Sequence, residues 1–359
     1  MPATEKKEVT LGFVPLTDSA PLIVAQELGF FYAQGLTVRL QKQNSWATLR
    51  DKLHTGVLDA AQMLAPMPIA STLGLGCRAH TVITPFVLSL NGNAITLSEA
   101  LYQCLQERGD LDTDQPLSAA ALKSIIAERK AAGQSKLKFA DVFPYSCHHY
   151  QMLDWLEAGG VDADEIDLMT VPPVSMVDCL SSGEIDGYCV GGPWNAKAVR
   201  SGNGYTALTS YDIWQDQPEK VLGFTGVFVD QYPKTVTALC VAIERACRWL
   251  EHIPNRFEAA RMLSHSKYLS APLDVIAPSL LGSCLTHHTK SPRQIEQYNR
   301  FYSRKMEGVN IPSVEHGRWL LEKMKAAGQI SEEMLEQVSI EEIFCEDLYQ
   351  KISSEFVQQ

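Results

Sequence analysis

Side chains that donate hydrogen bonds recur in this chain at the points where predicted strands end. Trp46 stands in the first turn of a predicted helix, where its indole N–H can donate and its ring offers a flat wall. Asn93 follows a long apolar run and carries an amide donor. His148 lies in the first turn of another helix, where unpaired backbone N–H groups favour an anion. With the charge of Lys220, this set suits a small monoanion better than a phosphate or a metal.

The turn Gly191-Gly192-Pro193 adds a second kind of donor, because two glycines let backbone N–H groups approach a small anion closely. An ordinary strand-to-helix turn is the alternative there. A thiol nucleophile at Cys147 with His148 as its base is disfavoured, since adjacent residues rarely reach each other and no third group orients the base. Each donor also has a purely structural alternative: a packed aromatic at Trp46, a turn residue at Asn93, a satisfied histidine at His148 and a solvated charge at Lys220.

Alternating strands and helices position these residues over the first 230 positions. Ser45 can cap the start of the predicted helix at 46–54, and Gly159 marks the end of the predicted helix at 147–158. After residue 229 the spacing is helical throughout. The sequence predicts strands at 9–14, 36–40, 60–64, 82–90, 94–97, 186–190 and 224–229, and helices at 46–54, 119–132, 147–158, 174–182, 194–199, 235–252, 255–265, 292–307 and 317–327.

This order predicts an α/β protein of two lobes with parallel sheets covered by helices. We expect lobe I to comprise residues 1–90 and 226–359, the latter with the C-terminal helices, and lobe II to comprise 91–225. The chain is then expected to cross between lobes near 85–93 and 221–229. Since ligands of open α/β sheets bind beyond the carboxyl ends of the strands, the expected site is the cleft between the lobes.

Composition bounds the function further. The 359 residues are 45% hydrophobic and 20% charged, with a net charge of −11 that argues against direct nucleic-acid binding. No apolar run is long enough to span a membrane. The nine cysteines form no CxxC pair, so neither a zinc site nor a disulfide framework is expected, and no cofactor is implied. The first eight residues lack the apolar core of a secretory signal, so we expect a cytoplasmic protein.

At the same residues the chain resembles the nitrate- and bicarbonate-binding proteins of bacterial ABC transporters. The resemblance covers most of residues 9–330 and implies a two-lobed, periplasmic-binding-protein-like (type II) fold with the ligand in the cleft between the lobes. The matching blocks include Gly12 to Leu22, Ser45 to Asp51, Leu64 to Pro68, Cys189 to Asn195 and Pro218 to Gly223.

The resemblance implies a set of ligand-binding residues in this chain. Lys220 discriminates within the family, because bicarbonate-binding relatives tend to carry an acidic residue there and recruit a cation. Two departures bear on ligand choice: Gly192 replaces a glutamate common in its block, and Asn93 is shorter than the usual glutamine. The implied ligand-binding residues are Trp46, Asn93, His148, Pro173, Val190, Gly191 and Lys220.

Together with the expected cytoplasmic location, the resemblance is to cytoplasmic nitrate sensors of the NasS type, which serve assimilatory nitrate operons. It implies a non-enzymatic protein that binds nitrate or nitrite. It also implies a protein partner, an RNA-binding antiterminator of the ANTAR type, which is held inactive and released when the ligand binds. The rivals are a solute-binding component of a nitrate ABC transporter and an enzyme related to pyrimidine-synthesising proteins. The latter carry a cysteine-rich block that this sequence does not show.

Overall fold

The structure is a computed structural model that describes residues 4–111, 116–306 and 308–356. It divides into two compact units: unit 1 comprises Met1–Leu90, Gln217–Leu273 and Asn299–Gln359, and unit 2 comprises Asn91–Asp216 and Asp274–Tyr298. The sequence places the return to the first lobe after residue 225 and keeps the rest of the chain there. In the structure the chain re-enters unit 1 at Gln217 and later contributes residues 274–298 to unit 2.

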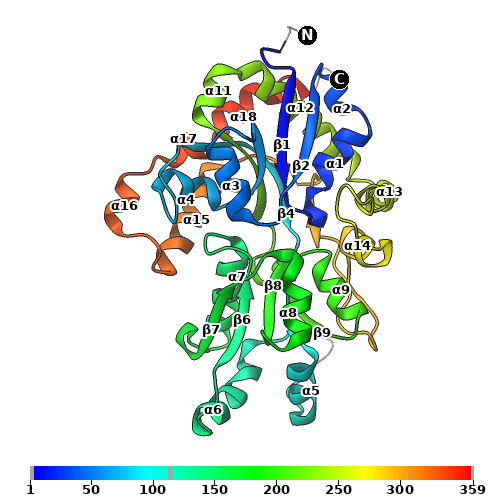
Figure 1. Ribbon diagram of the computed structural model, residues 1–359, viewed down its shortest axis with the longest axis vertical. Helices are drawn as coiled ribbons and strands as arrows, with labels where there is room; N and C mark the ends of the chain where they lie inside the picture. The colour runs from blue at the N-terminus through cyan, green and yellow to red at the C-terminus, as the bar shows by residue number, and fades with distance from the viewer. Residues whose placement is uncertain (1–3, 112–115, 307, 357–359) are drawn as a thin grey trace. The chain divides into compact units, whose positions relative to one another are not determined.

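Unit 1 is built on a six-stranded sheet of mixed direction (Figure 1). β1 pairs in parallel with β2 and β3, whereas β10 runs antiparallel to both β3 and β4. The expected all-parallel sheet is therefore wrong, because β10 brings the chain back from unit 2 in the opposite direction. The order is β13 (Asn299–Arg300), β4 (Val82–Asn91), β10 (Pro218–Thr225), β3 (Ala60–Leu64), β1 (Glu8–Phe13) and β2 (Thr37–Lys42).

Helices cover the sheet of unit 1. α12 packs on α1 and α2 through a continuous apolar stripe, and Ser45 caps α3 by accepting a hydrogen bond from the Thr48 N–H (3.2 Å). Among the described residues, none of the helices combines the length and apolar character needed to cross a membrane. The helices are α1 (Ala20–Glu27), α2 (Phe30–Ala33), α3 (Trp46–His54), α4 (Met67–Leu73), α11 (Gly226–Gln231), α12 (Pro233–Trp249), α13 (Ile253–Leu263), α15 (Val314–Ala326), α16 (Glu332–Glu336), α17 (Ile340–Ile343) and α18 (Glu346–Ser353), with the 3₁₀ turn η1 (Thr17–Ser19).

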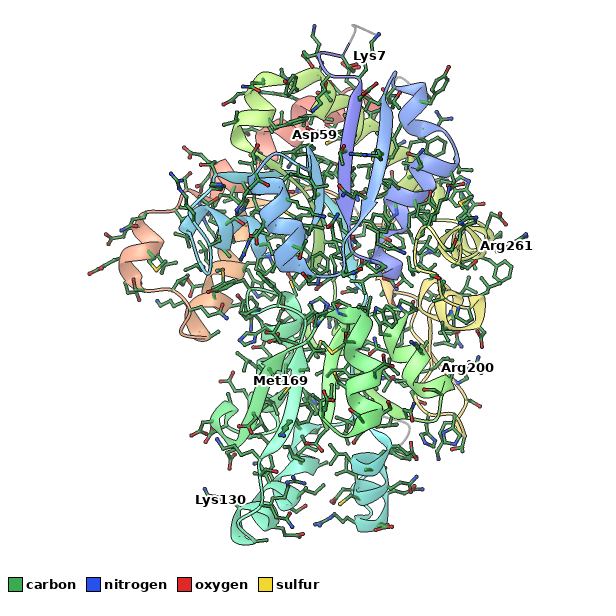
Figure 2. All side chains as sticks on the ribbon, viewed as in Figure 1. Lys7, Asp59, Lys130, Met169, Arg200 and Arg261 are labelled. Atoms are coloured by element: carbon green, nitrogen blue, oxygen red, sulfur yellow. The ribbon has the colours of Figure 1, made fainter. Side chains whose placement is uncertain are left out.

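Asp59, labelled in Figure 2, anchors the start of β1 within this unit. Its carboxylate accepts hydrogen bonds from the Thr10 backbone N–H (2.9 Å) and from the Lys6 ammonium (2.6 Å). These two bonds tie the first strand to the turn that precedes β3. The strand therefore ends at a defined register, which places the residues that follow it.

Unit 2 is built on a five-stranded mixed sheet. β6 pairs in parallel with β7 and β8, while β5 runs antiparallel to β8 and β9. Trp155 lies in the core of this unit and packs against Phe139. The strands are β7 (Ile166–Thr170), β6 (Leu137–Asp141), β8 (Gly187–Gly191), β5 (Asn93–Ser98) and β9 (Gly204–Thr209), with helices α5 (Glu99–Arg108), α6 (Lys123–Ala131), α7 (Cys147–Ala158), α8 (Met176–Ser182), α9 (Trp194–Arg200), α10 (Ser210–Trp214) and α14 (Leu273–Leu280), the 3₁₀ turns η2 (Ala119–Leu122), η3 (Ala163–Glu165) and η4 (Pro173–Ser175), and the short pair β11 (Ser283–Cys284) and β12 (Arg293–Gln294).

Two predicted elements are wrong. Of the helix expected at 292–307, residues 292–306 are extended chain and turns, including β12 and β13, and residue 307 lies outside the described residues. Ile295, Tyr298 and Phe301 are buried at intervals of three residues, which imitates a helical stripe. The segment is instead held in place by the Arg293 guanidinium, which pairs with Asp212 at 2.7 Å. The strand expected at 224–229 is the end of β10 followed by α11.

One histidine makes the stability of unit 1 sensitive to pH. Burial, with a smaller contribution from the neighbouring His80 ring 4.5 Å away, lowers the pKa of His54 to about 4. The unfolded chain takes up this proton near pH 6.5, so stability is lost as pH falls from about 6.5 to 4. Because solvent partly screens this half-buried ring, we expect the loss to be about 1–2 kcal/mol. Denaturant titrations at several pH values give the unfolding free energy of wild type and of His54→Gln. Between pH 6.5 and 4 we expect it to fall more steeply in wild type than in the variant, by this amount.

Candidate functional site

In unit 1, three functional side chains follow the carboxyl ends of parallel strands or lie beside them. Asp18 lies in η1, directly after β1, and Trp46 opens α3 after β2. Lys220 is on the antiparallel β10, where its backbone pairs with Leu64 at the carboxyl end of β3. The sheet therefore collects all three residues at the same edge, the edge where α/β proteins bind ligands.

Lys220 is fully buried between two carboxylates. Its ammonium lies 2.8 Å from Asp18 Oδ2 and 2.7 Å from Glu219 Oε1. Gln62 supports this arrangement, because its amide donates to Asp18 Oδ1 (2.7 Å) while its own oxygen accepts from the Val14 N–H (3.2 Å). The position of the charge is thus fixed by neighbours from the segment after β1, from β3 and from β10.

The charge state of Lys220 follows from these contacts. Burial opposes the ammonium most strongly, but the carboxylates of Asp18 and Glu219 outweigh it and raise the pKa of Lys220 above its ordinary value. The lysine is therefore positively charged at any physiological pH. Counted by formal charge, the two carboxylates and the ammonium sum to one negative charge. Binding of an anion beside them would therefore depend on hydrogen-bond donors directed at it and not on the net charge of the cluster.

Trp46 lies over this cluster. Its side chain is fully buried, and the Lys220 ammonium is 5.6 Å from the centre of its ring, within cation–π range. Among the described residues, the indole Nε1 has no hydrogen-bond acceptor. A buried donor without an acceptor costs roughly 1–3 kcal/mol, so this N–H is a free hydrogen-bonding group available to a ligand.

In unit 2, the predicted residues also gather at one edge of a sheet. His148 follows β6, Pro173 follows β7, and Gly191 is the last residue of β8. Asn93 is the first residue of β5, which runs antiparallel and therefore begins at the edge where the others end. Asn93 and Gly191 are partners in the β5–β8 pairing. The topology thus collects residues that are up to about a hundred positions apart in sequence.

The Asn93 side chain is already engaged within this group. Its Nδ2 donates one of its two hydrogens to Gln151 Oε1 (3.0 Å), so this neighbour orients the amide, and the predicted contact with a ligand stays a prediction. Its Oδ1 has no partner among the described residues. Gln151 also accepts a weak bond from the Cys189 thiol at 3.7 Å. Asn93 and Gln151 therefore form a pair, and both are almost completely buried.

His148 is fully buried in the first turn of α7, three residues before Gln151 and so on the same side of the helix. Ser146 caps this helix by accepting from the His149 N–H at 3.1 Å. The neighbouring His149 is held by Asp141: its Nδ1 lies 2.7 Å from Asp141 Oδ2, and Thr170 donates to the other oxygen of that carboxylate (2.9 Å).

The remaining predicted residues are part of the same edge. Pro173 is buried and opens η4. The Val190 carbonyl accepts from Asn195 Nδ2 (2.8 Å), which fixes the turn that follows Gly191. The part that the resemblance assigns to Pro173 in ligand binding stays a prediction.

Sequence reasoning missed four residues of these clusters. Asp18, Glu219 and Gln62 surround Lys220, and Gln151 partners Asn93. Asp18 and Glu219 stand inside blocks that carry the family resemblance, and Gln151 is three positions from His148 on a predicted helix. These positions in the sequence could have suggested the four residues. The contact between Lys220 and Asp18, however, depends on the register of β3 and β10, which the sequence does not reveal.

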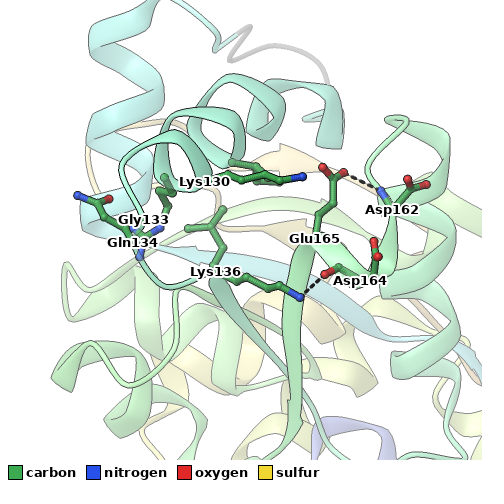
Figure 3. A pocket seen from close by; sticks show the side chains of 10 residues that line it. Lys130, Gly133, Gln134, Lys136, Asp162, Asp164 and Glu165 are labelled. Atoms are coloured by element: carbon green, nitrogen blue, oxygen red, sulfur yellow. Dashed lines mark hydrogen bonds between the residues drawn. The ribbon is translucent and has the colours of Figure 1, made fainter.

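A cavity of unit 2 is lined by none of the residues of the unit 2 cluster. It has a volume of about 540 Å³ and opens beside α6 (Figure 3). Two residues that line it form hydrogen bonds with other residues of its lining: Lys136 donates to the Asp164 carbonyl, and Glu165 accepts from the Asp162 N–H (3.1 Å). Positive and negative groups are interleaved there, so this cavity is a poor site for a monoanion.

Two α/β units, each with polar residues gathered at one edge of a mixed β-sheet, are typical of a solute-binding protein. The chain belongs to the NMT1-like family, whose model matches residues 2–264. Its fold is that of the periplasmic binding proteins. The crystal structure of the periplasmic nitrate-binding protein NrtA from Synechocystis PCC 6803 superposes with a TM-score of 0.88 at 29% identity, covering 98% of this chain and 89% of that one.

Sequence relatives carry similar names. The nitrate/nitrite binding protein NrtA of Synechococcus elongatus is 34% identical over 97% of this chain and 78% of its own length. The nitrate import ATP-binding protein NrtC of Synechocystis is 35% identical over 95% of this chain, which spans about half (50%) of NrtC. The NrtA relatives are named as binding proteins rather than as enzymes.

Proposed function

We propose that this chain binds nitrate or nitrite, and that residues of both clusters contribute to the binding. The observation that carries the proposal is the buried Lys220 ammonium beside the Trp46 ring, whose indole N–H has no acceptor among the described residues. A planar monoanion accepts hydrogen bonds at its rim, and the ammonium and the indole N–H are both donors for such an acceptor. The names of the NrtA relatives support this choice of ligand.

The size of the ligand limits its affinity. Nitrate has four heavy atoms, and a ceiling of about −1.5 kcal/mol per atom gives roughly −6 kcal/mol, or tens of micromolar. A dissociation constant below that requires charge-assisted hydrogen bonds in a site that excludes water. Lys220 in unit 1 and the buried His148 in unit 2 are the groups we propose to supply them.

The surplus of negative charge around Lys220 leads to a specific prediction. Glu219→Gln keeps an oxygen that can accept from the Lys220 ammonium but removes one negative charge. We expect nitrate to bind roughly three- to tenfold more tightly, because one like charge near the anion is gone. Calorimetric titration of the purified variant measures this. Glu128→Gln, at an exposed carboxylate that pairs with Arg108, is the matched control and should leave affinity unchanged. Weaker binding in Glu219→Gln would contradict the electrostatic argument.

We further propose a regulatory role in the cytoplasm. The chain sequesters an RNA-binding antiterminator of the ANTAR type and releases it when nitrate or nitrite binds, which controls nitrate assimilation genes. Support comes from the resemblance to NasS-type sensors. It also comes from charge, since an RNA-binding partner needs a basic surface and this chain carries a net charge of −11.

Thermodynamic linkage makes the sensor role testable. If nitrate and the antiterminator favour different states of the chain, each must weaken the other's binding by the same factor, typically five- to 150-fold. Affinity of the purified partner should be measured with and without nitrate, and affinity for nitrate with and without the partner. Equal factors in the two measurements support the switch. Partner binding that nitrate does not change would rule it out while leaving nitrate binding itself intact.

A second candidate function is the solute-binding component of a nitrate ABC transporter. The names of the NrtA and NrtC relatives favour it. The two roles differ in a deletion strain: loss of a transport component lowers nitrate uptake, whereas loss of the proposed sensor leaves the assimilation genes expressed without nitrate. Cell fractionation adds a second criterion, since recovery of the chain from the periplasm supports transport.

A further inference from the structure

Unit 2 brings a glutamate and two histidines together away from the proposed anion-binding residues. Glu99 is the first residue of α5, and His287 and His288 lie in the loop between β11 and β12. One ligand atom from each of the three residues can be chosen so that all lie within 4.8 Å of one another. In Figure 1 this loop runs down the side of unit 2 toward α5.

The His287 ring is held in one orientation. Its Nε2 lies 3.1 Å from Glu99 Oε2, and its Nδ1 lies 2.8 Å from the Thr289 hydroxyl. The ring stacks on Tyr102 with centroids 4.3 Å apart and is nearly buried. Without a metal, Nε2–H can donate to Glu99 while Nδ1 accepts from the Thr289 hydroxyl and, at 3.4 Å, from the Thr289 backbone N–H. A metal at Nε2 requires the other tautomer, in which Nδ1–H donates to the Thr289 hydroxyl oxygen and the Nε2 lone pair is free. Metal-binding histidines usually have such a partner on the second nitrogen.

His288 completes the group from the solvent side. Its ring centre is 4.1 Å from that of His287, and the side chain is exposed. Glu99 is partly exposed and also accepts a hydrogen bond from Gln103 at 2.6 Å, so its carboxylate is oriented as well. A carboxylate at the first position of a helix is stabilised in its ionised form. Three protein ligands that leave a fourth position open to water is an arrangement found in zinc sites of proteins.

We propose that Glu99, His287 and His288 form a binding site for a divalent transition metal, with Zn²⁺ as the best match. Two imidazole nitrogens and one carboxylate suit a metal of borderline softness, whereas Ca²⁺ and Mg²⁺ prefer sites made of oxygen alone. The sequence argument against zinc rested on cysteine spacing, and this set uses no cysteine. The metal would join the start of α5 to the loop at 285–290 and stabilise unit 2.

A purely structural role makes a different prediction for His288. The hydrogen bond between His287 and Glu99 fixes the loop on α5 by itself, and in that case the exposed His288 has no function. His288 therefore separates the two accounts. Replacing it leaves the His287–Glu99 bond and the Tyr102 stacking in place, so the variant is expected to fold normally.

The test measures Zn²⁺ binding to the full chain after removal of metals with a chelator. Competition against a chromogenic chelator gives affinity and stoichiometry for wild type, His288→Ala, Glu99→Gln and Thr289→Val. His252→Ala, which removes an exposed histidine in unit 1, is the matched control. The visible spectrum with Co²⁺ in place of Zn²⁺ reports on imidazole coordination. Thermal unfolding with and without Zn²⁺ shows whether the metal stabilises the fold.

We expect wild type and His252→Ala to bind Zn²⁺ at one equivalent per chain and to gain thermal stability from it. His288→Ala and Glu99→Gln should each weaken binding by at least about tenfold, and Thr289→Val by about tenfold, with recovery in Thr289→Ser. The proposal is overturned if wild type shows no stoichiometric binding, or if His288→Ala binds Zn²⁺ as wild type does. Nitrate affinity should be the same in wild type and His288→Ala, so this result is independent of the proposed function.

Discussion

Replacing Lys220 with methionine is expected to weaken nitrate binding strongly and to destabilise the protein at the same time. The substitution leaves Asp18 and Glu219 buried without their shared cation, a change that typically costs about 3–5 kcal/mol of unfolding free energy. Nitrate loses a charge-assisted hydrogen bond worth about 1.5–3 kcal/mol, which corresponds to roughly ten- to 100-fold in affinity. Denaturant unfolding and calorimetry measure the two effects separately.

A compensated variant separates folding from binding in this experiment. Combining Lys220→Met with Asp18→Asn and Glu219→Gln removes all three charges together. Removing all three charges together removes the uncompensated buried charge that makes the single substitution costly. The combined variant should therefore recover most of the lost stability while still failing to bind nitrate. Nitrate affinity equal to wild type in this variant would exclude Lys220 as a ligand.

Trp46→Phe is expected to weaken nitrate binding, and to lower stability only through the packing that the smaller ring loses in a buried position. The lost indole N–H has no acceptor among the described residues, so folding loses no hydrogen bond. If that N–H binds the anion, affinity falls by about 1.5–3 kcal/mol, the range for hydrogen bonds to charged groups. Calorimetry gives the affinity, and denaturant titration gives the stability.

Trp155→Phe is the matched control for this prediction. Its indole N–H donates to the Leu117 carbonyl at 2.8 Å, so its removal should destabilise unit 2 and leave nitrate binding unchanged. The proposed sensor role adds an expectation for Trp46→Ala, which should lose nitrate yet retain the antiterminator and keep the operon off. Release of the partner by that variant without ligand would assign Trp46 to the protein interface instead.

Elements with strong local signals could be predicted from the sequence. The expected bounds of α3, β3 and α7 agree with the structure because Ser45 and Ser146 supply caps and Gly56 and Gly159 mark where the helices end. The segment at 292–307 could not be predicted. Its spacing imitates a helix, and its extended form depends on an ion pair between Arg293 and Asp212, which lie 81 positions apart in sequence.

The candidate site, like the fold, could be predicted only in part from the sequence. Trp46, His148 and Gly191 follow strands that a βα pattern reveals, so their place at a sheet edge follows from topology. The partners that set their chemistry were not predictable. Asp18 reaches Lys220 only through the antiparallel pairing of β10 with β3, and the Asn93 amide donor is directed to Gln151 by the pairing of β5 with β8.

Calorimetric titration of the purified chain with nitrate, nitrite, bicarbonate and sulfate tests the central proposal most directly. We expect saturable binding of nitrate or nitrite with a dissociation constant of roughly tens of micromolar or lower, and at least about tenfold weaker binding of bicarbonate and sulfate. The compensated Lys220 variant should show no heat with any of them. Absence of saturable nitrate and nitrite binding to the wild-type chain, or a preference for bicarbonate, would contradict the proposed function.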